Sequence, residues 1–194
     1  MKKIQVQFAH HITIVGSTRQ SAIDFWEGVL GMPFLFEQPN LGKSDENHLY
    51  FDPGDGRLLT VFTNESRVDA VRPAPREIGC VDHLAFGVSR ATFDLAPERL
   101  REHGIEFIER DRGFMNSIYL IDPNGLKVEL ACYKFDVPDG LRAADILVCA
   151  YRLRLERGDH HIAEEHLADA LALLMGARPY GLAHGDHRHE LTGN

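Results

Sequence analysis

The chain has few cysteines, and their number excludes the folds and sites that depend on thiols. Among 194 residues there are three, Cys80, Cys132 and Cys149, and none of them stands in a CxxC pair. An odd count without paired spacing provides neither a disulfide framework nor a cysteine zinc site. We therefore expect reduced thiols, most of them buried.

The sequence also lacks a basic cluster and a long apolar run. Its 21 lysines and arginines stand against 29 aspartates and glutamates, which gives a formal net charge of −8. Such a chain is poorly suited to bind nucleic acid or an anionic membrane surface. No apolar stretch approaches the length of a membrane span, and polar residues between Gln5 and His11 interrupt any signal-like segment. We expect a cytoplasmic protein with no nucleic-acid partner and no membrane association.

What the sequence does contain is an internal repeat. Residues 8–15 and 80–87 are similar short runs in which a histidine is followed by alternating apolar residues. Each run precedes a helical pattern, with Ser17 and Thr18 able to cap the first helix and Ser89 able to cap the second. Glycines at positions 31 and 104 are predicted to end the two helices.

Each predicted helix leads into three further strands. The expected strands are 34–36, 49–51 and 57–63 in the first copy and 105–108, 119–121 and 126–133 in the second. In both copies an Asp-Pro pair followed by glycine or asparagine predicts the turn before the last strand. The order is β-α-β-β-β, twice, which indicates an α+β fold.

We therefore predict two βαβββ modules, at 1–66 and 78–135, that form a curved mixed sheet around a metal site. The linker from Arg67 to Pro75 is rich in proline and charge, as a boundary should be. Residues 136–194 are expected to form a C-terminal helical extension with a flexible, histidine-rich tail.

Two amphipathic helices are predicted in this extension. Their apolar stripes are Leu141, Ala144, Val148, Tyr151 and Leu155 in one, and Leu167, Ala170, Leu171 and Leu174 in the other. Such stripes need a partner, so the helices should cover the modules or a second subunit, and we expect a homodimer.

Strand alternation places His11, His83 and Glu129 on one face of the modules. Their apolar neighbours are expected to pack on the helices, so these three side chains point away from them. The repeat relates His11 to His83, and it puts Thr60 in the first copy where Glu129 stands in the second. Taken singly, a strand histidine or a glutamate is commonly structural or solvated. Together they suit one divalent metal with open coordination positions: Fe(II), or alternatively Mn(II) or Zn(II).

The same residues lie in segments that resemble a known family. The segments HHITIVGS, AIDFWEGVLGM, HLYFDPGDGRLLTVFTN and DRGFMNSIYLIDPNGLKVELA resemble the vicinal oxygen chelate superfamily of glyoxalases and extradiol dioxygenases. The resemblance covers residues 8–135 and is nearest to dioxygenases that open hydroquinone rings. It implies that His11, His83 and Glu129 are iron ligands and that Arg112 and Tyr119 form a second-sphere acid/base pair.

Two departures from those hydroquinone enzymes stand out. They usually carry more modules per chain. They also tend to have paired histidines at the second ligand, whereas here Asp82 precedes His83.

The expected function is that of an Fe(II)-dependent ring-cleaving dioxygenase that takes a small aromatic diol and dioxygen. Tyr119 would donate a proton or hydrogen bond, and Arg112 would stabilise developing negative charge. Both also fit plain structural roles, as a packed strand aromatic and a surface cation. Two alternatives stay open: a metal-dependent isomerase or lyase of the glyoxalase type, and a protein that sequesters an aromatic natural product. The lack of a carboxylate at Thr60 argues against the usual glyoxalase ligand set.

Overall fold

The order of strands and helices repeats along the chain, as the sequence predicts. The computed structural model describes residues 3–70 and 73–176. The first module consists of β1 (His11–Val15), α1 (Arg19–Ile23), a π-helix η1 (Asp24–Val29), β2 (Phe34–Pro39), β3 (Asn47–Phe51) and β4 (Leu58–Thr63). The second consists of β5 (Leu84–Gly87), α2 (Arg90–Glu102), β6 (Phe107–Asp111), β7 (Met115–Ile121) and β8 (Lys127–Tyr133). Two helices follow, α3 (Ala143–Arg157) and α4 (Glu164–Gly176).

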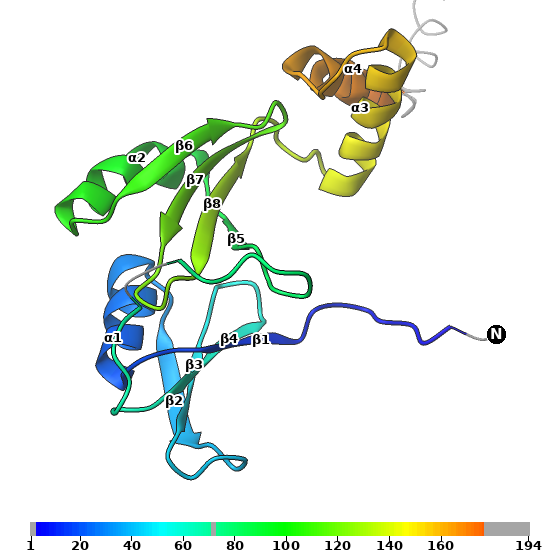
Figure 1. Ribbon diagram of the computed structural model, residues 1–194. Coiled ribbons are helices and arrows are strands. Elements are labelled where there is room, and N and C mark those ends of the chain that lie inside the picture. The colour runs from blue at the N-terminus through cyan, green and yellow to red at the C-terminus, as the bar shows by residue number, and fades with distance from the viewer. Residues whose placement is uncertain (1–2, 71–72, 177–194) are drawn as a thin grey trace, which may run out of the picture. The chain divides into compact units, whose positions relative to one another are not determined.

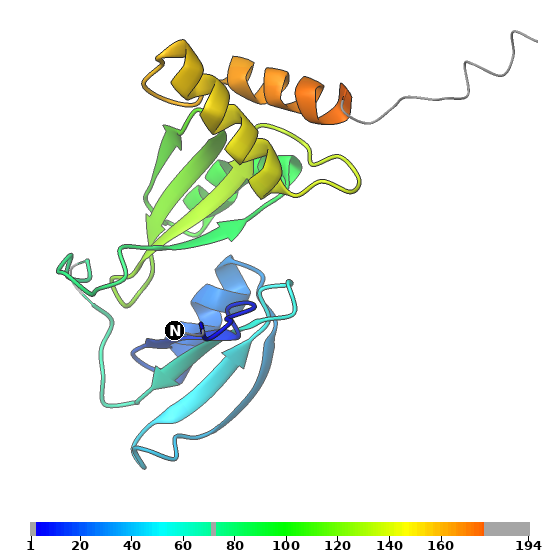
Figure 2. The same cartoon turned by 90° about the vertical axis from the view of Figure 1, so that its right-hand side faces the viewer.

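Each module has its own open, four-stranded mixed sheet. The strand order is β1-β4-β3-β2 in the first and β5-β8-β7-β6 in the second (Figure 1). In each sheet the first strand pairs in parallel with the last one of the module. The fold is therefore α+β with two repeated modules, and each sheet has one helix-bearing face (Figure 2).

The helices begin and end where the sequence predicts. The Thr18 side chain accepts a hydrogen bond from the Ser21 backbone at the start of α1, and the Ser89 side chain does the same from Thr92 at the start of α2. Gly31 and Gly104, just beyond the helical segments, have φ angles of 67° and 68°. This left-handed backbone favours glycine, which explains both ends.

The register of the two parallel strand pairs preserves the repeat in three dimensions. Thr13 lies opposite Thr60, and Ala85 lies opposite Glu129. The predicted equivalence of Thr60 and Glu129 is confirmed by this register.

The two modules belong to one compact unit, which holds the described residues 3–70, 73–110 and 117–132. Its core contains the apolar residues that alternate with the predicted ligands, among them Leu84, Val128 and Leu130. Ile14 packs against this core, but Ile12 is 40% exposed, contrary to expectation. Ile12 lies near the start of β1, whereas Ile14, farther along the same strand, reaches the core.

Of the described residues, 111–116 and 133–176 form a second unit, in which α3 packs on α4. Leu167 and Ala170 of α4 are buried, and Leu171 and Leu174 are partly buried, so the predicted stripe of α4 is confirmed.

The predicted stripe of α3 is wrong. Val148, Tyr151 and Leu155 are about half exposed, whereas Ile146 and Ala150 are buried against α4. The two buried residues are one helical turn apart and therefore share the face that meets α4.

The module boundaries, the C-terminal tail and the absence of a membrane span were also predicted. The module boundaries at 66, 78 and 135 stay predictions. The histidine-rich tail lies outside the described residues. Within residues 3–70 and 73–176, no helix is both long enough and apolar enough to cross a membrane.

Candidate functional site

The second module joins two of the predicted metal ligands. His83 lies just before β5, and its Nε2 is 2.8 Å from Oε2 of Glu129 on β8. Parallel pairing of β5 with β8 places Ala85 opposite Glu129, which brings the start of β5 to this carboxylate. The Glu129 residue is 1% exposed, so the pair is largely shielded from water on the carboxylate side.

The second oxygen of Glu129 also has a partner. The buried Ser117 hydroxyl on β7 donates a hydrogen bond to Oε1 at 2.5 Å. A buried carboxylate without partners would be costly, and here both oxygens are held in place. Ser117 was not among the residues predicted for the site, although alternation along β7 puts it on the same face as Tyr119.

Asp82 holds the other side of the His83 ring. Its Oδ2 lies 2.9 Å from His83 Nδ1 and accepts a hydrogen bond from Lys127 Nζ at 2.9 Å. Its Oδ1 pairs with Arg76 Nε at 2.5 Å. The hydrogen bonds with His83 and then Lys127 hold the pKa of Asp82 well below its usual range, so the carboxylate is ionised.

Tyr119 lies against His83. Their rings meet edge to face, with centroids 5.7 Å apart and planes at 89°. Tyr119 also lines a cavity of about 670 Å³, a size typical of small-ligand sites. The remaining lining residues are Arg101, Ile105, Glu106, Phe107, Ile108, Leu120, Ile121 and Lys127.

His11 lies in the first module, on the exposed part of β1. Its Nδ1 is 2.9 Å from Nδ1 of His10. Burial, followed by the charge of His11, lowers the pKa of His48 on β3 of the same sheet. Two residues beyond His11, Thr13 accepts a hydrogen bond from Thr60 at 2.8 Å.

The structure does not gather all three predicted ligands into one cluster. Over residues 3–70 and 73–176, three ligand atoms come within 4.8 Å of one another at Asp159, Glu165 and His166 alone. Thus His83 and Glu129 are together, and His11 is not joined to them. The shared metal site stays a prediction.

The cluster in the second unit has a structural explanation. His166 Nδ1 accepts a hydrogen bond from the Ala163 backbone, and its Nε2 lies 2.9 Å from Asp159 Oδ2. Because both ring nitrogens are already used and the ring is fully buried, His166 fixes the loop before α4.

Arg112 lies between β6 and β7, in the unit that contains α3 and α4. It is exposed, and its backbone N–H donates to Met115. Its assignment as the acid/base partner of Tyr119 stays a prediction.

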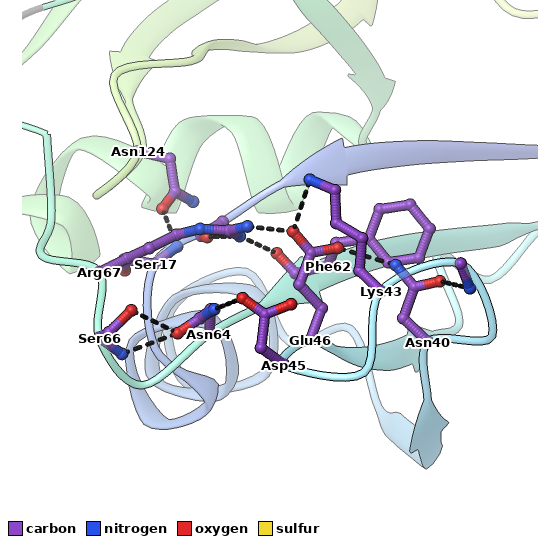
Figure 3. A network of polar contacts seen from close by, with 12 residues as sticks. Ser17, Asn40, Lys43, Asp45, Glu46, Phe62, Asn64, Ser66, Arg67 and Asn124 are labelled. Atoms are coloured by element: carbon purple, nitrogen blue, oxygen red, sulfur yellow. Dashed lines mark hydrogen bonds and ion pairs between the residues drawn. The ribbon is translucent and has the colours of Figure 1, made fainter.

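A second buried carboxylate, also missed from the sequence, lies in the first module. Figure 3 shows Glu46 receiving hydrogen bonds from Arg67, Asn40 and Lys43. Arg67 also donates to the backbone oxygens of Gly16 and Phe62. Burial acts to raise the pKa of Glu46, but the hydrogen bonds from Arg67, Asn40 and Lys43 together lower it. The network ties the residue that begins the linker to the ends of β1 and β4.

The donor set beside Tyr119 suits a divalent metal. Two ligand atoms at neighbouring positions of an ion, each about 2.1 Å from it, lie roughly 3 Å apart. The His83 and Glu129 atoms are 2.8 Å apart, which matches that geometry.

Two known proteins are similar to more than half of the chain. The chain is 27% identical over 125 residues to the glutathione transferase FosA of Serratia marcescens, covering 64% of this chain and 80% of FosA. It is 26% identical over 121 residues to MhqO of Bacillus subtilis (strain 168), a protein assigned to the ring-cleaving dioxygenases. That match covers 62% of this chain and 38% of MhqO.

Solved structures share the fold. A glyoxalase family protein from Enterococcus faecalis superposes with a TM-score of 0.52 at 29% identity, covering 64% of this chain and 97% of that one. The fosfomycin resistance protein FosX from Listeria monocytogenes, solved with Mn(II), gives a TM-score of 0.50 at 20% identity, covering 65% and 92%.

Residues 9–130 match the family described as the Glyoxalase/Bleomycin resistance protein/Dioxygenase superfamily, some of whose members bind divalent metals. That match covers both modules, from the residue before His10 to the residue after Glu129. The chain belongs to this superfamily.

Proposed function

We propose that this protein is an Fe(II)-dependent dioxygenase that cleaves the ring of a small aromatic diol. The observation that carries the proposal is the convergence of His83 Nε2 and Glu129 Oε2, 2.8 Å apart. The Tyr119 ring that packs against His83 also lines a cavity. His11 would supply the third ligand. When bound, the ion would acidify a phenol of the substrate and leave positions open for dioxygen.

The chain's own residues would bind and orient the ring. The cavity that Tyr119 lines offers Ile105, Phe107 and Ile121 as apolar walls and Tyr119 as a residue that carries a hydroxyl. Apolar walls with a few placed polar groups are typical of sites for small aromatic ligands. Tyr119, whose ring packs against His83, would donate a proton or hydrogen bond at the reacting end of the substrate.

We further propose that the site is completed in a homodimer, with His11 from one copy and the His83–Glu129 pair from the other. The support is that one chain holds two of the ligands together and leaves His11 apart, on β1 of the first module.

The test combines metal analysis with oxygen uptake. Purified protein should contain, or take up after anaerobic Fe(II) reconstitution, about one divalent ion per chain, and should then consume dioxygen with a catechol or hydroquinone. Glu129→Gln is the matched loss-of-ligand variant and should bind the metal far more weakly. Protein that takes up no divalent metal overturns the proposal.

The same assay distinguishes the alternatives. The likeness to FosA favours one other candidate, a metal-dependent transfer or addition to a small organic substrate. Turnover without oxygen uptake would assign that chemistry, or a glyoxalase-type isomerase or lyase. Binding of an aromatic compound without turnover by the metal-loaded protein would assign a sequestering role. Metal content would decide between Fe(II), Mn(II) and Zn(II).

A further inference from the structure

We propose that Asp82 is a positioning residue that fixes the His83 ring with Nε2 directed at Glu129, and that it thereby sets the metal affinity of the site. The inference rests on the proposed function, because it concerns the same site. Asp82 is the residue at which the sequence departs from paired histidines.

The hydrogen-bond partners of the His83 ring decide which of its nitrogens faces Glu129. An ionised carboxylate is an acceptor only, so the 2.9 Å contact from His83 Nδ1 to Asp82 requires a hydrogen on Nδ1. Nε2 is then the nitrogen directed at Glu129, 2.8 Å from Oε2. Since two lone pairs would repel at that distance, a hydrogen must lie between these two atoms as well, and a bound divalent ion would take its place.

Asp82 is itself held in place by two cations. Lys127 and Arg76 both contact it, at 2.9 and 2.5 Å, and keep it charged and oriented. Lys127 begins β8, the strand that carries Glu129 two residues later. One strand therefore positions the Glu129 carboxylate directly and the His83 ring through Asp82.

A continuous series of contacts results, from Arg76 and Lys127 through Asp82, His83 and Glu129. A histidine ligand held by a carboxylate is a more basic and better oriented donor, and loss of such a partner weakens metal affinity about 10- to 100-fold.

The experiment measures affinity for Mn(II) by chelator competition, without relying on turnover. Asp82→Ala should weaken binding about 10- to 100-fold, and Asp82→Asn, which keeps an acceptor oxygen, should recover part of the loss. Asp55→Ala is the matched control, since Asp55 is also an exposed aspartate paired with an arginine, Arg57. It should leave affinity within about twofold of the wild type.

Two readouts separate positioning from a structural role. Nitrogen-15 NMR of the metal-free histidines should show a hydrogen on Nδ1 of His83 in the wild type and a changed Nδ1 signal in Asp82→Ala. Arg76→Met removes one anchor and keeps the Asp82–His83 bond, so it should change affinity much less than Asp82→Ala.

The outcomes are distinguishable. A wild-type protein that binds no divalent metal defeats the proposed function. If the wild type binds metal and Asp82→Ala binds it equally well, the role of Asp82 is wrong and the metal site stands. Equal losses in Asp82→Ala and Arg76→Met, with unchanged NMR signals, would make Asp82 a structural tie and overturn the inference.

Discussion

Glu129 is buried with both carboxylate oxygens in use, one on His83 and one on Ser117. At the scale of single residues, this arrangement explains why a glutamate can sit in the middle of a sheet. On the other side of the His83 ring, Nδ1 contacts Asp82. The rings of His83 and Tyr119 pack edge to face. Side chains that are restrained in this way present their donor atoms in one geometry, which favours binding of a metal ion that prefers that geometry.

The role of Tyr119 leads to a prediction at this scale. Tyr119→Phe keeps the ring that packs on His83 and removes the hydroxyl, so metal affinity should be retained. If the hydroxyl moves a proton, the turnover rate of the metal-loaded enzyme should fall about 100- to 10,000-fold. Steady-state oxygen uptake with separate kcat and KM values checks this, and an unchanged kcat would leave Tyr119 a packing residue.

At the scale of elements, the parallel pairing of the first and last strands of each module decides which residues meet. It brings His83 to Glu129 in the second module and Thr13 to Thr60 in the first. The first module uses another device at the end of its strands, the buried Glu46–Arg67 pair, which attaches the start of the linker to β1 and β4 (Figure 3).

This pair gives a prediction about pH. The folded pKa of Glu46 lies below its ordinary value of 4.5, so its contribution to stability is complete above about that pH and is lost as the pH falls through the folded pKa. Glu46→Gln should therefore be less stable than the wild type at neutral pH, and the difference should shrink in acid.

Urea unfolding of both proteins at a series of pH values measures the effect on the free energy of unfolding. Glu98→Gln, on the exposed face of α2, is the control and should change stability little at either end of the range. A difference between Glu46→Gln and the wild type that does not depend on pH would contradict the assignment.

At the scale of the whole molecule, the arrangement of the modules decides which ligands share a site. A single chain separates His11 from the His83–Glu129 pair, and we propose that a second copy supplies the missing ligand. Oligomers of this kind have self-complementary interfaces, so two equivalent sites would form at once.

Complementation tests this arrangement. His11→Ala and Glu129→Gln variants, each inactive alone, should regain about a quarter of wild-type activity when unfolded together, mixed equally and refolded, because half of the dimers would be mixed and carry one intact site of two. If each site forms within one chain, the mixture stays inactive. Size-exclusion chromatography with light scattering gives the oligomeric state in the same samples.

The sequence alone indicated the repeated module, the helix ends and the face on which the candidate ligands lie. These features depend on local patterns: alternation in strands, capping residues, and glycines where the backbone is left-handed. The same patterns related Thr60 to Glu129, and the strand register agrees with this.

Other features depended on contacts between distant residues, which no local pattern encodes. Ser117 became visible as a partner of Glu129, and Lys127 as a partner of Asp82, only through the tertiary structure. The face of α3 that is buried was decided by α4, because several of its faces are apolar and only packing selects one.

The sequence has few cysteines and no basic cluster or long apolar run, and this shortage restricts the classes of site that the chain can form. It left histidine and carboxylate as the groups able to hold a metal. Tertiary structure then decided which of them meet: His83 and Glu129 are brought together by one parallel strand pair, whereas His11 stays on the edge strand of another sheet. Sequence alternation determines the face on which a side chain lies, and the pairing of strands determines its neighbours.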